Sequence, residues 1–181
     1  TESIDFTTFG LADGATLDDV NAVLAPFGVH LDATNIVVEG GLIGFPSFQF
    51  LSPVVNFDRT VQSFSALVEN PLVGAIDLEL FGYAGTETVG TASDPLTTVS
   101  DTLLQGVPQT LTLPGSQELR SVGFLPDLGL AFPFLIRELE FQRPQDAIAV
   151  NLQLGEIASN ISVDLQPGSD SGVSPQDNLT N

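Results

Sequence analysis

The sequence predicts an all-β fold, an antiparallel two-sheet β-sandwich with one short N-terminal helix. Apolar and polar residues alternate with a period of two along most of the chain, Gly, Pro, Asn and Asp separate the alternating stretches, and helical periodicity occurs once. An α/β fold would need a helix between successive strands. The pattern therefore favours two packed antiparallel sheets, each with one face toward the core.

The helical stretch is ATLDDVNAVLAPFG, residues 15–28. Thr16 is expected to cap its start, and the carboxylates of Asp18 and Asp19 favour its first turn. Its apolar face comprises Leu17, Val20 and Leu24. Pro26 then stops the helix after about two and a half turns.

The predicted strands are recognised by apolar residues two positions apart. These residues are Ile4 and Phe6; Val29 and Leu31; Ile36 and Val38; Phe48 and Phe50; Phe64, Ala66 and Val68; Ile76, Leu78 and Leu80; Leu111 and Leu113; Val122 and Phe124; Leu139 and Phe141; Ile148, Val150, Leu152 and Leu154; and Ile161, Val163 and Leu165. In GAIDLELF, residues 74–81, the pattern directs Leu78 inward and Asp77 and Glu79 to water, and the following AGTETVG turns into a threonine-rich neighbouring strand.

The length of 181 residues suits one domain with its own core. We expect a single β-sandwich over residues 1–165 and a polar C-terminal tail over residues 166–181, whose composition is typical of disordered segments.

The net charge of −19 comes from 23 acidic residues against four arginines and no lysine. Phosphate backbones and anionic lipids are bound by clustered Lys and Arg, so nucleic-acid and peripheral-membrane roles are excluded. The longest uncharged run, residues 40–57, contains prolines and glycines that would interrupt a membrane-spanning helix, so no membrane insertion is expected. It is interpreted as two short phenylalanine-rich strands and a turn, or as an apolar loop that awaits a partner.

The chain has no cysteine, which excludes disulfides, thiol nucleophiles and thiolate metal sites. It begins at Thr1, which suggests a mature form whose signal peptide has been removed. The expected location is secreted, extracellular or on the cell surface.

Three segments carry a resemblance to known domains: residues 61–93, from VQSFSALVEN to TVGTAS; residues 108–127, PQTLTLPGSQELRSVGFLPD; and residues 132–141, FPFLIRELEF. With the opening IDFTTFGLADGATLDDV and FGVHLD, their order resembles the jelly-roll β-sandwich domains of bacterial secreted and surface proteins, many of which carry a C-terminal PEP-type sorting signal. The resemblance spans residues 3–142 and implies a jelly-roll-like sandwich.

The chain departs from that pattern at two places. Arg137 and Glu138 stand where such domains commonly have Asp-Asn before the closing strand, and the C-terminal region contains no PEP-type motif with a hydrophobic tail. A ligand role for that pair and anchoring by that signal are therefore not expected.

No catalytic constellation stands out. His30, the only histidine, shares a strand face with Asp32, an arrangement that could imitate a base and its orienting carboxylate. No G-x-S-x-G elbow supplies a nucleophile, and no pair of carboxylates is singled out for a glycosidase. The chain is expected to be non-enzymatic and to require no cofactor.

Calcium is the ion that this chain would bind most readily, because its many carboxylates are hard oxygen ligands. The candidate metal ligands are Asp13, Asp18 and Asp19; further pairs are Asp32 with Asn35 and Asp170 with Asp177. The alternative is turn and cap chemistry, since Asp13-Gly14 is a good turn.

Sugar rings usually stack on exposed Trp or Tyr, and this chain has no Trp and one Tyr. Tyr83 is therefore the candidate for ligand stacking. Asn160 and Asn178 head two N-x-S/T sequons that would accept glycans in a suitable host.

The favoured function is a non-enzymatic secreted structural protein, a subunit of an extracellular filament, sheath or matrix. Such a homo-oligomer or polymer would assemble by donating its terminal strands to the exposed sheet edges of neighbours. The candidate assembly strands carry Ile4 and Phe6 at one end, and Ile161, Val163 and Leu165 at the other. The alternative is a calcium-assisted polysaccharide-binding module.

Overall fold

A computed structural model describes residues 1–144 of the chain except positions 46–52, 92, 116 and 127–133. Residues Thr1–Pro144 form one compact unit. The predictions of strands at residues 48–50, 148–154 and 161–165, and of the domain boundary at residue 165, lie outside the described residues.

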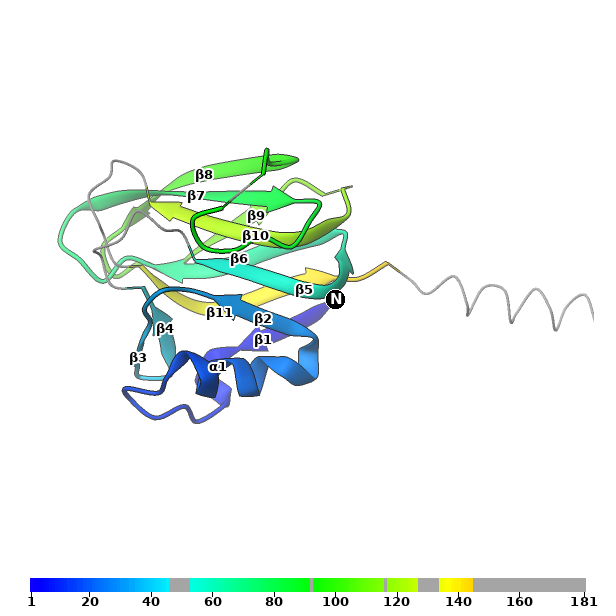
Figure 1. The fold of residues 1–181 in the computed structure, drawn as a ribbon. Helices are drawn as coiled ribbons and strands as arrows, with labels where there is room; N and C mark the ends of the chain where they lie inside the picture. Colours follow the sequence, from blue (N-terminus) through cyan, green and yellow to red (C-terminus); the bar gives the residue numbers. More distant parts are fainter. Residues whose placement is uncertain (46–52, 92, 116, 127–133, 145–181) are drawn as a thin grey trace, which may run out of the picture. The chain divides into compact units, whose positions relative to one another are not determined.

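The described residues of this unit form one α-helix, two 3-10 turns and a series of strands (Figure 1). The helical elements are η1 (Phe6–Thr8), α1 (Leu17–Leu24) and η2 (Ala25–Phe27). The strands are β1 (Glu2–Asp5), β2 (Val29–Asp32), β3 (Val37–Glu39), β4 (Leu42–Gly44), β5 (Val54–Val61), β6 (Ser63–Glu69), β7 (Ala75–Tyr83), β8 (Thr97–Leu104), β9 (Gln109–Leu113), β10 (Leu119–Pro126) and β11 (Leu135–Gln142).

The strands form two antiparallel sheets. One has the order β2-β5-β10-β7-β8, and the other has the order β3-β4-β11-β6-β9, with β1 also paired to β11. Four of the strand pairs are nested one inside the next along the chain, as in a long hairpin that is rolled into two sheets. From the innermost outward, these pairs are β7 with β8, β6 with β9, β5 with β10, and β4 with β11. This topology confirms the predicted two-sheet sandwich and its jelly-roll-like character.

Phenylalanine rings fill the space between the sheets. Phe57 of β5 packs edge-on against Phe64 of β6 in the opposite sheet, with 6.0 Å between ring centroids. Phe64 in turn contacts Phe124 of β10 at 6.2 Å, and Phe57 contacts Phe141 of β11 at 5.2 Å. All four are at most 1% exposed. Aromatic burial between the sheets is therefore a main source of the unit's stability.

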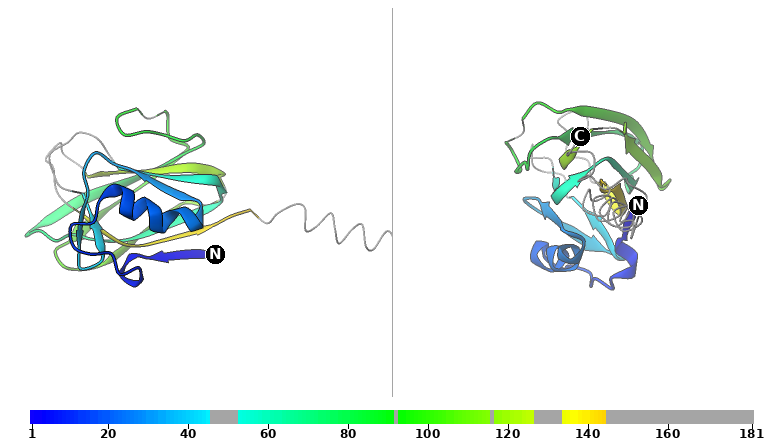
Figure 2. Two further views of the ribbon diagram at one scale, coloured as in Figure 1. Left: turned by 60° about the horizontal axis from the view of Figure 1, so that its bottom comes forward. Right: turned by 90° about the vertical axis from the view of Figure 1, so that its right-hand side faces the viewer.

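The predicted helix is α1, and its N-terminal signal is confirmed. The hydroxyl of Thr16 accepts a hydrogen bond from the Asp19 backbone N–H, and the Asp19 carboxylate accepts one from the Thr16 N–H at 2.8 Å. Val20 and Leu24 are buried and join the core. The helix lies beside β2 and covers the core there (Figure 2).

The period-two predictions agree with the observed burial. In β7, Leu78 and Leu80 are fully buried, Asp77 is exposed and Glu79 is partly exposed. β5 is absent from the predicted strands, because its first half falls in the uncharged run interpreted as two short phenylalanine-rich strands and a turn, and its second half, Asp58 to Val61, has no apolar residues two positions apart. It is held as a strand because β10 pairs with it on one side.

Candidate functional site

The outer face of the five-stranded sheet carries an aromatic pair. Phe81 and Tyr83 lie two residues apart on β7, and their rings stack at 6.4 Å with an interplanar angle of 26°. The paired strand β10 contributes Gly123 opposite Phe81. A Cβ at Gly123 would lie 3.3 Å from Cε2 of Tyr83, so the missing side chain makes room for the ring. Phe81 is partly exposed, whereas Tyr83 is 6% exposed.

The prediction of Tyr83 as an exposed stacking platform is wrong in one respect, because its ring is buried. Burial raises the pKa of the Tyr83 hydroxyl above its usual value, and the carboxylates of Glu87 and Glu79 raise it further. The ring that remains partly open to solvent on this face is that of its neighbour, Phe81.

A strap, residues 85–89 of the β7–β8 connection, crosses the outer face of the five-stranded sheet (Figure 1). On β10, the Ser121 hydroxyl donates to the Gly85 carbonyl at 2.7 Å. On β5, the Asn56 carboxamide donates to the Glu87 carbonyl at 3.0 Å and accepts from its N–H at 3.1 Å. Successive strands thus hold every second residue of the strap.

The far end of the strap is held by β2, where the Asp32 carboxylate accepts a hydrogen bond from the Val89 N–H at 2.9 Å. After the strap, the chain turns back toward β8, and Ser93 is held there by Glu87. The Glu87 carboxylate accepts a hydrogen bond from the Ser93 N–H at 3.1 Å and another from the Ser93 hydroxyl. The predicted hairpin between β7 and β8 is confirmed by their antiparallel pairing, and its connection is an ordered cover for part of the sheet.

His30 and Asp32 share the outer face of β2, as predicted. His30 is exposed, and the Asp32 carboxylate serves the strap rather than the imidazole. The structure therefore gives this pair no base-and-orienter geometry.

The three predicted calcium ligands are not gathered into one site. Asp13 accepts from the Gly40 N–H at 2.9 Å, and Asp19 belongs to the capping box of α1. The two hydrogen bonds from Thr16 lower the pKa of Asp19 below its usual value. Asp18 is exposed in the first turn of the helix. Among residues 1–144 outside the gaps, no three acidic or imidazole groups lie close enough to hold a metal. The observed roles of Asp13 and Asp19 are those of turn and cap chemistry.

In this structure the N-terminal candidate assembly segment pairs within its own chain, the arrangement that competes with donation to a neighbour. β1 pairs antiparallel with β11 of the same chain, with Ile4 opposite Leu139. Ile4 and Phe6 are 0% and 2% exposed in the domain's own core. A salt bridge of 3.2 Å between Glu2 and Arg143 further ties β1 down. The other candidate assembly residues, Ile161, Val163 and Leu165, lie outside the described residues, as do Asn160, Asn178, Asp170 and Asp177.

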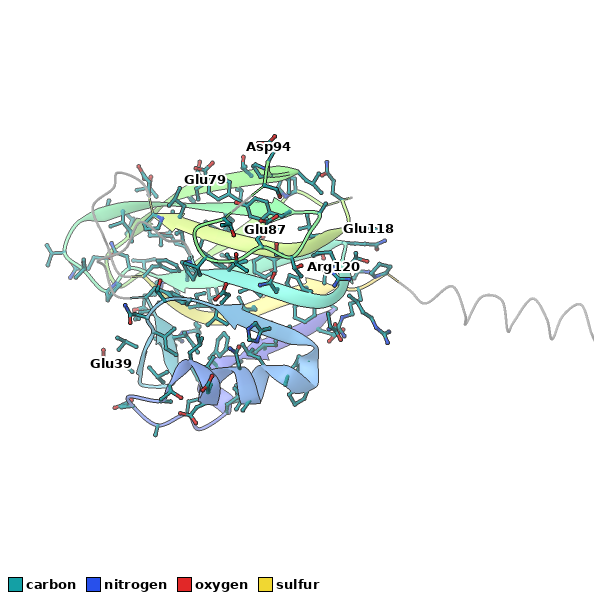
Figure 3. All side chains as sticks on the ribbon, viewed as in Figure 1. Glu39, Glu79, Glu87, Asp94, Glu118 and Arg120 are labelled. Atoms are coloured by element: carbon teal, nitrogen blue, oxygen red, sulfur yellow. The ribbon has the colours of Figure 1, made fainter. Side chains whose placement is uncertain are left out.

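The acidic side chains are spread over the surface rather than focused. Figure 3 shows Glu79 on β7 and Glu87 and Asp94 in the connection that follows it, whereas Glu39 ends β3 at the other side of the unit. Arg120 lies near Glu118. In the part of the chain that the structure describes, no helix is long and apolar enough to cross a membrane.

Sequence reasoning missed Phe81, Asn56 and Ser121. Phe81 continues the outward register of Asp77 and Glu79 in GAIDLELF, and an apolar residue on the polar face of an alternating strand was the available signal. Asn56 and Ser121 gave no signal, because their partners are main-chain groups of a connection distant in the sequence.

No protein-family model and no curated protein matches this chain. Among solved structures, it is similar to a glycoside hydrolase family 43 arabinoxylan arabinofuranohydrolase from Bacillus subtilis in complex with cellotetraose. That similarity has 12% identity and a TM-score of 0.37, and it covers 79% of this chain and 27% of the other.

Two further similarities are of the same order. The arabinose-bound α-L-arabinofuranosidase MgGH51 has 14% identity, a TM-score of 0.40 and coverage of 73% of this chain and 25% of that one. BiXyn10A CBM1 has 10% identity, a TM-score of 0.38 and coverage of 79% and 97%. The chain thus spans about a quarter of the two arabinofuranosidases. These scores carry no argument about function, and the fold rests on the strand pairing described above.

Proposed function

We propose that this domain is a non-catalytic, extracellular polysaccharide-binding module whose binding surface is the open part of the outer face of the five-stranded sheet. The observation that carries the proposal is the partly exposed residue Phe81, whose ring stacks on that of the buried Tyr83. A ring backed by a second, buried ring loses little conformational freedom on binding. The C–H face of a sugar can stack on such a surface.

Polar groups flank the ring. Thr98 lies opposite Phe81 on β8, and the next outward pair along the same strands is Glu79 opposite Ser100. Thr98 and Ser100 are exposed. Hydroxyls and a carboxylate beside an aromatic ring supply the donors and acceptors that orient a sugar. Carboxylates on this face and a chain charge of −19 disfavour polyanions, so the proposed ligand is an uncharged glycan chain.

The non-enzymatic character remains part of the proposal. The described geometry supports it because His30 and Asp32 do not form a catalytic pair and Asp32 is engaged by Val89. The extracellular location rests on the resemblance to secreted and surface domains. The structural-subunit hypothesis is not retained for the N-terminal segment, because that segment pairs within its own domain.

The test is affinity electrophoresis of the 181-residue chain against a panel of soluble neutral polysaccharides, with Phe81→Ala as the key variant. We expect retardation on at least one polymer and a loss of affinity of about tenfold or more in Phe81→Ala, the size that removing one stacked ring produces. Val73→Ala is the control, since Val73 is 89% exposed beyond the opposite end of β7. Equal retardation of Phe81→Ala and wild type would place binding elsewhere, and no retardation on any polymer would refute the module.

The chain itself supplies a second readout. Tyr83 is the only tyrosine and there is no tryptophan, so ultraviolet-excited fluorescence reports on one ring that contacts Phe81. Sugar bound on Phe81 should change this emission with a saturating dependence on ligand concentration. An unchanged emission alongside real retardation would contradict binding at Phe81.

A further inference from the structure

We infer that both edges of the five-stranded sheet are closed to strand addition by side chains that imitate a neighbouring strand. Strand β8 would pair with a second copy of this chain once its caps, Gln109 and Asp101, are removed. The edge strands of this sheet are β2 and β8. A free edge presents unpaired N–H and C=O groups, and proteins that remain discrete block such edges.

At β2 the cap is Asn21 of α1. Its carboxamide donates to the Leu31 carbonyl at 2.9 Å and accepts from the Leu31 N–H at 2.7 Å. The Asp58 N–H donates to the Gly28 carbonyl at 2.9 Å. From Gly28 onward, every second residue of this segment therefore directs its main-chain groups toward β5. That alternation directs the main-chain groups of Leu31 away from β5, to the open side. One side chain thus satisfies the donor and the acceptor that a further strand would use.

At β8 the cap is Gln109, the first residue of β9. Its carboxamide accepts from the Leu104 N–H at 2.8 Å and donates to the Thr102 carbonyl at 3.1 Å. The Thr102 N–H donates to the Asp101 carboxylate at 2.8 Å, and the Leu104 carbonyl accepts from the Val107 N–H at 3.2 Å. All four main-chain groups of Thr102 and Leu104 are therefore occupied.

The uncapped remainder of β8 is short. By the same alternation, Thr98 and Ser100 direct their main-chain groups to the open side, and both residues are exposed. Two such residues are fewer than a stable strand pairing needs. Removal of the caps would lengthen the open run to Thr98, Ser100 and Thr102 and would free the N–H of Leu104, whose carbonyl stays bonded to the Val107 N–H. Two copies of this run can pair antiparallel about a twofold axis.

The cap at β8 is tested by the mass in solution of the full chain carrying Asp101→Ala and Gln109→Ala, measured by light scattering after size exclusion. Roughly 0.5 M salt is used so that the charge of −19 is screened. We expect a monomeric wild type and a concentration-dependent shift of the double variant toward twice the monomer mass. The control, Asp94→Ala with Gln117→Ala, removes the same charge and the same amide from exposed positions off the β8 edge and should remain monomeric.

A rescue variant locates the contact. Ser100→Pro is added to the double variant. It removes the Ser100 N–H, which faces the open side and makes no hydrogen bond to β7, and it should restore the monomer. A double variant that stays monomeric while its circular dichroism matches wild type overturns the inference. So does a dimer that persists with Ser100→Pro or that also forms in the control variant.

Amide hydrogen exchange on wild type keeps the inference testable if the double variant fails to fold. Thr102 and Leu104 should exchange more slowly than Thr98 and Ser100, because only the first pair is capped. Equal rates for the four amides would show that the caps do not hold the edge.

Discussion

Gly28 and Asp58 are in direct contact at the point where β2 joins β5: a Cβ placed on Gly28 would lie 2.3 Å from Oδ1 of Asp58. Gly28 also has φ of +59°, a left-handed conformation that ends η2. Its carbonyl accepts the Asp58 N–H at 2.9 Å. The position therefore favours glycine for its backbone, and a larger side chain would also have to displace the exposed Asp58 carboxylate.

Gly28→Ala should destabilise the domain by about 1–3 kcal/mol, mostly from the left-handed backbone cost, because the Asp58 carboxylate is the end of an exposed side chain and can move aside at a small further cost. Gly10→Ala is the matched control, since Gly10 has φ of +64° and nothing within 4 Å of a Cβ. It should cost only about 1–2 kcal/mol. Urea unfolding measures both variants, and equal losses would contradict a role for the Asp58 contact.

Leu78→Ala should cost about 2–5 kcal/mol, because Leu78 is 0% exposed between the sheets and its truncation leaves a cavity. Thr112→Ala, on the exposed face of β9, is the control and should change the free energy of unfolding by less than about 0.5 kcal/mol. A loss within experimental noise for Leu78→Ala would contradict the burial of this face of β7.

Thr16→Ala should destabilise the domain by about 0.5–2 kcal/mol through loss of the helix cap. The lowered pKa of Asp19 means that the folded state favours the ionised carboxylate. The stability that comes from this shift is present above the unfolded-state pKa, about 4, and is lost as pH falls through the lowered folded-state pKa. Thr16→Ala keeps the backbone N–H that is the main cause of this shift, so the acid test uses Asp19→Asn, whose difference in unfolding free energy from wild type should shrink in acid. A difference that stays constant across this range would exclude the Asp19 contribution.

The raised pKa of Tyr83 predicts an alkaline loss of stability. The unfolded chain releases this proton near pH 10 while the folded chain still holds it. Stability should therefore fall as pH rises above about 10 and continue to fall up to the folded-state pKa. Absorbance of the phenolate measures the titration directly, because the chain has one tyrosine.

Two variants separate the causes of the Tyr83 shift. Glu87→Gln should lower the titration midpoint because it removes the larger of the two carboxylate contributions. Tyr83→Phe should remove the absorbance change and this part of the alkaline loss. A wild-type midpoint at or below 10 would contradict the burial of the ring.

Local features of the sequence predicted those parts of the fold that depend on near neighbours along the chain. The capping box of Thr16 and Asp19 closes over three residues, and the alternation of Ile76, Leu78 and Leu80 is a property of one strand. Such signals need no knowledge of the partner strand. The second half of β5 lacks them, and its pairing with distant β10 decided it.

The sequence by itself therefore determined the sandwich, its buried faces and the short helix, because period-two and period-3.6 burial are written into consecutive residues. Only the tertiary structure decided that Ile4 lies in its own core, that Tyr83 is covered and Phe81 is partly open, and that Asn21 and Gln109 cap sheet edges. Each of these depends on a contact that forms only when the elements pack against one another, even where the two elements are close together in the chain, as for Asn21 with β2 and Gln109 with β8. Side-chain type alone does not specify such partners, since one carboxamide can bind water, a turn or the edge of a sheet with the same groups.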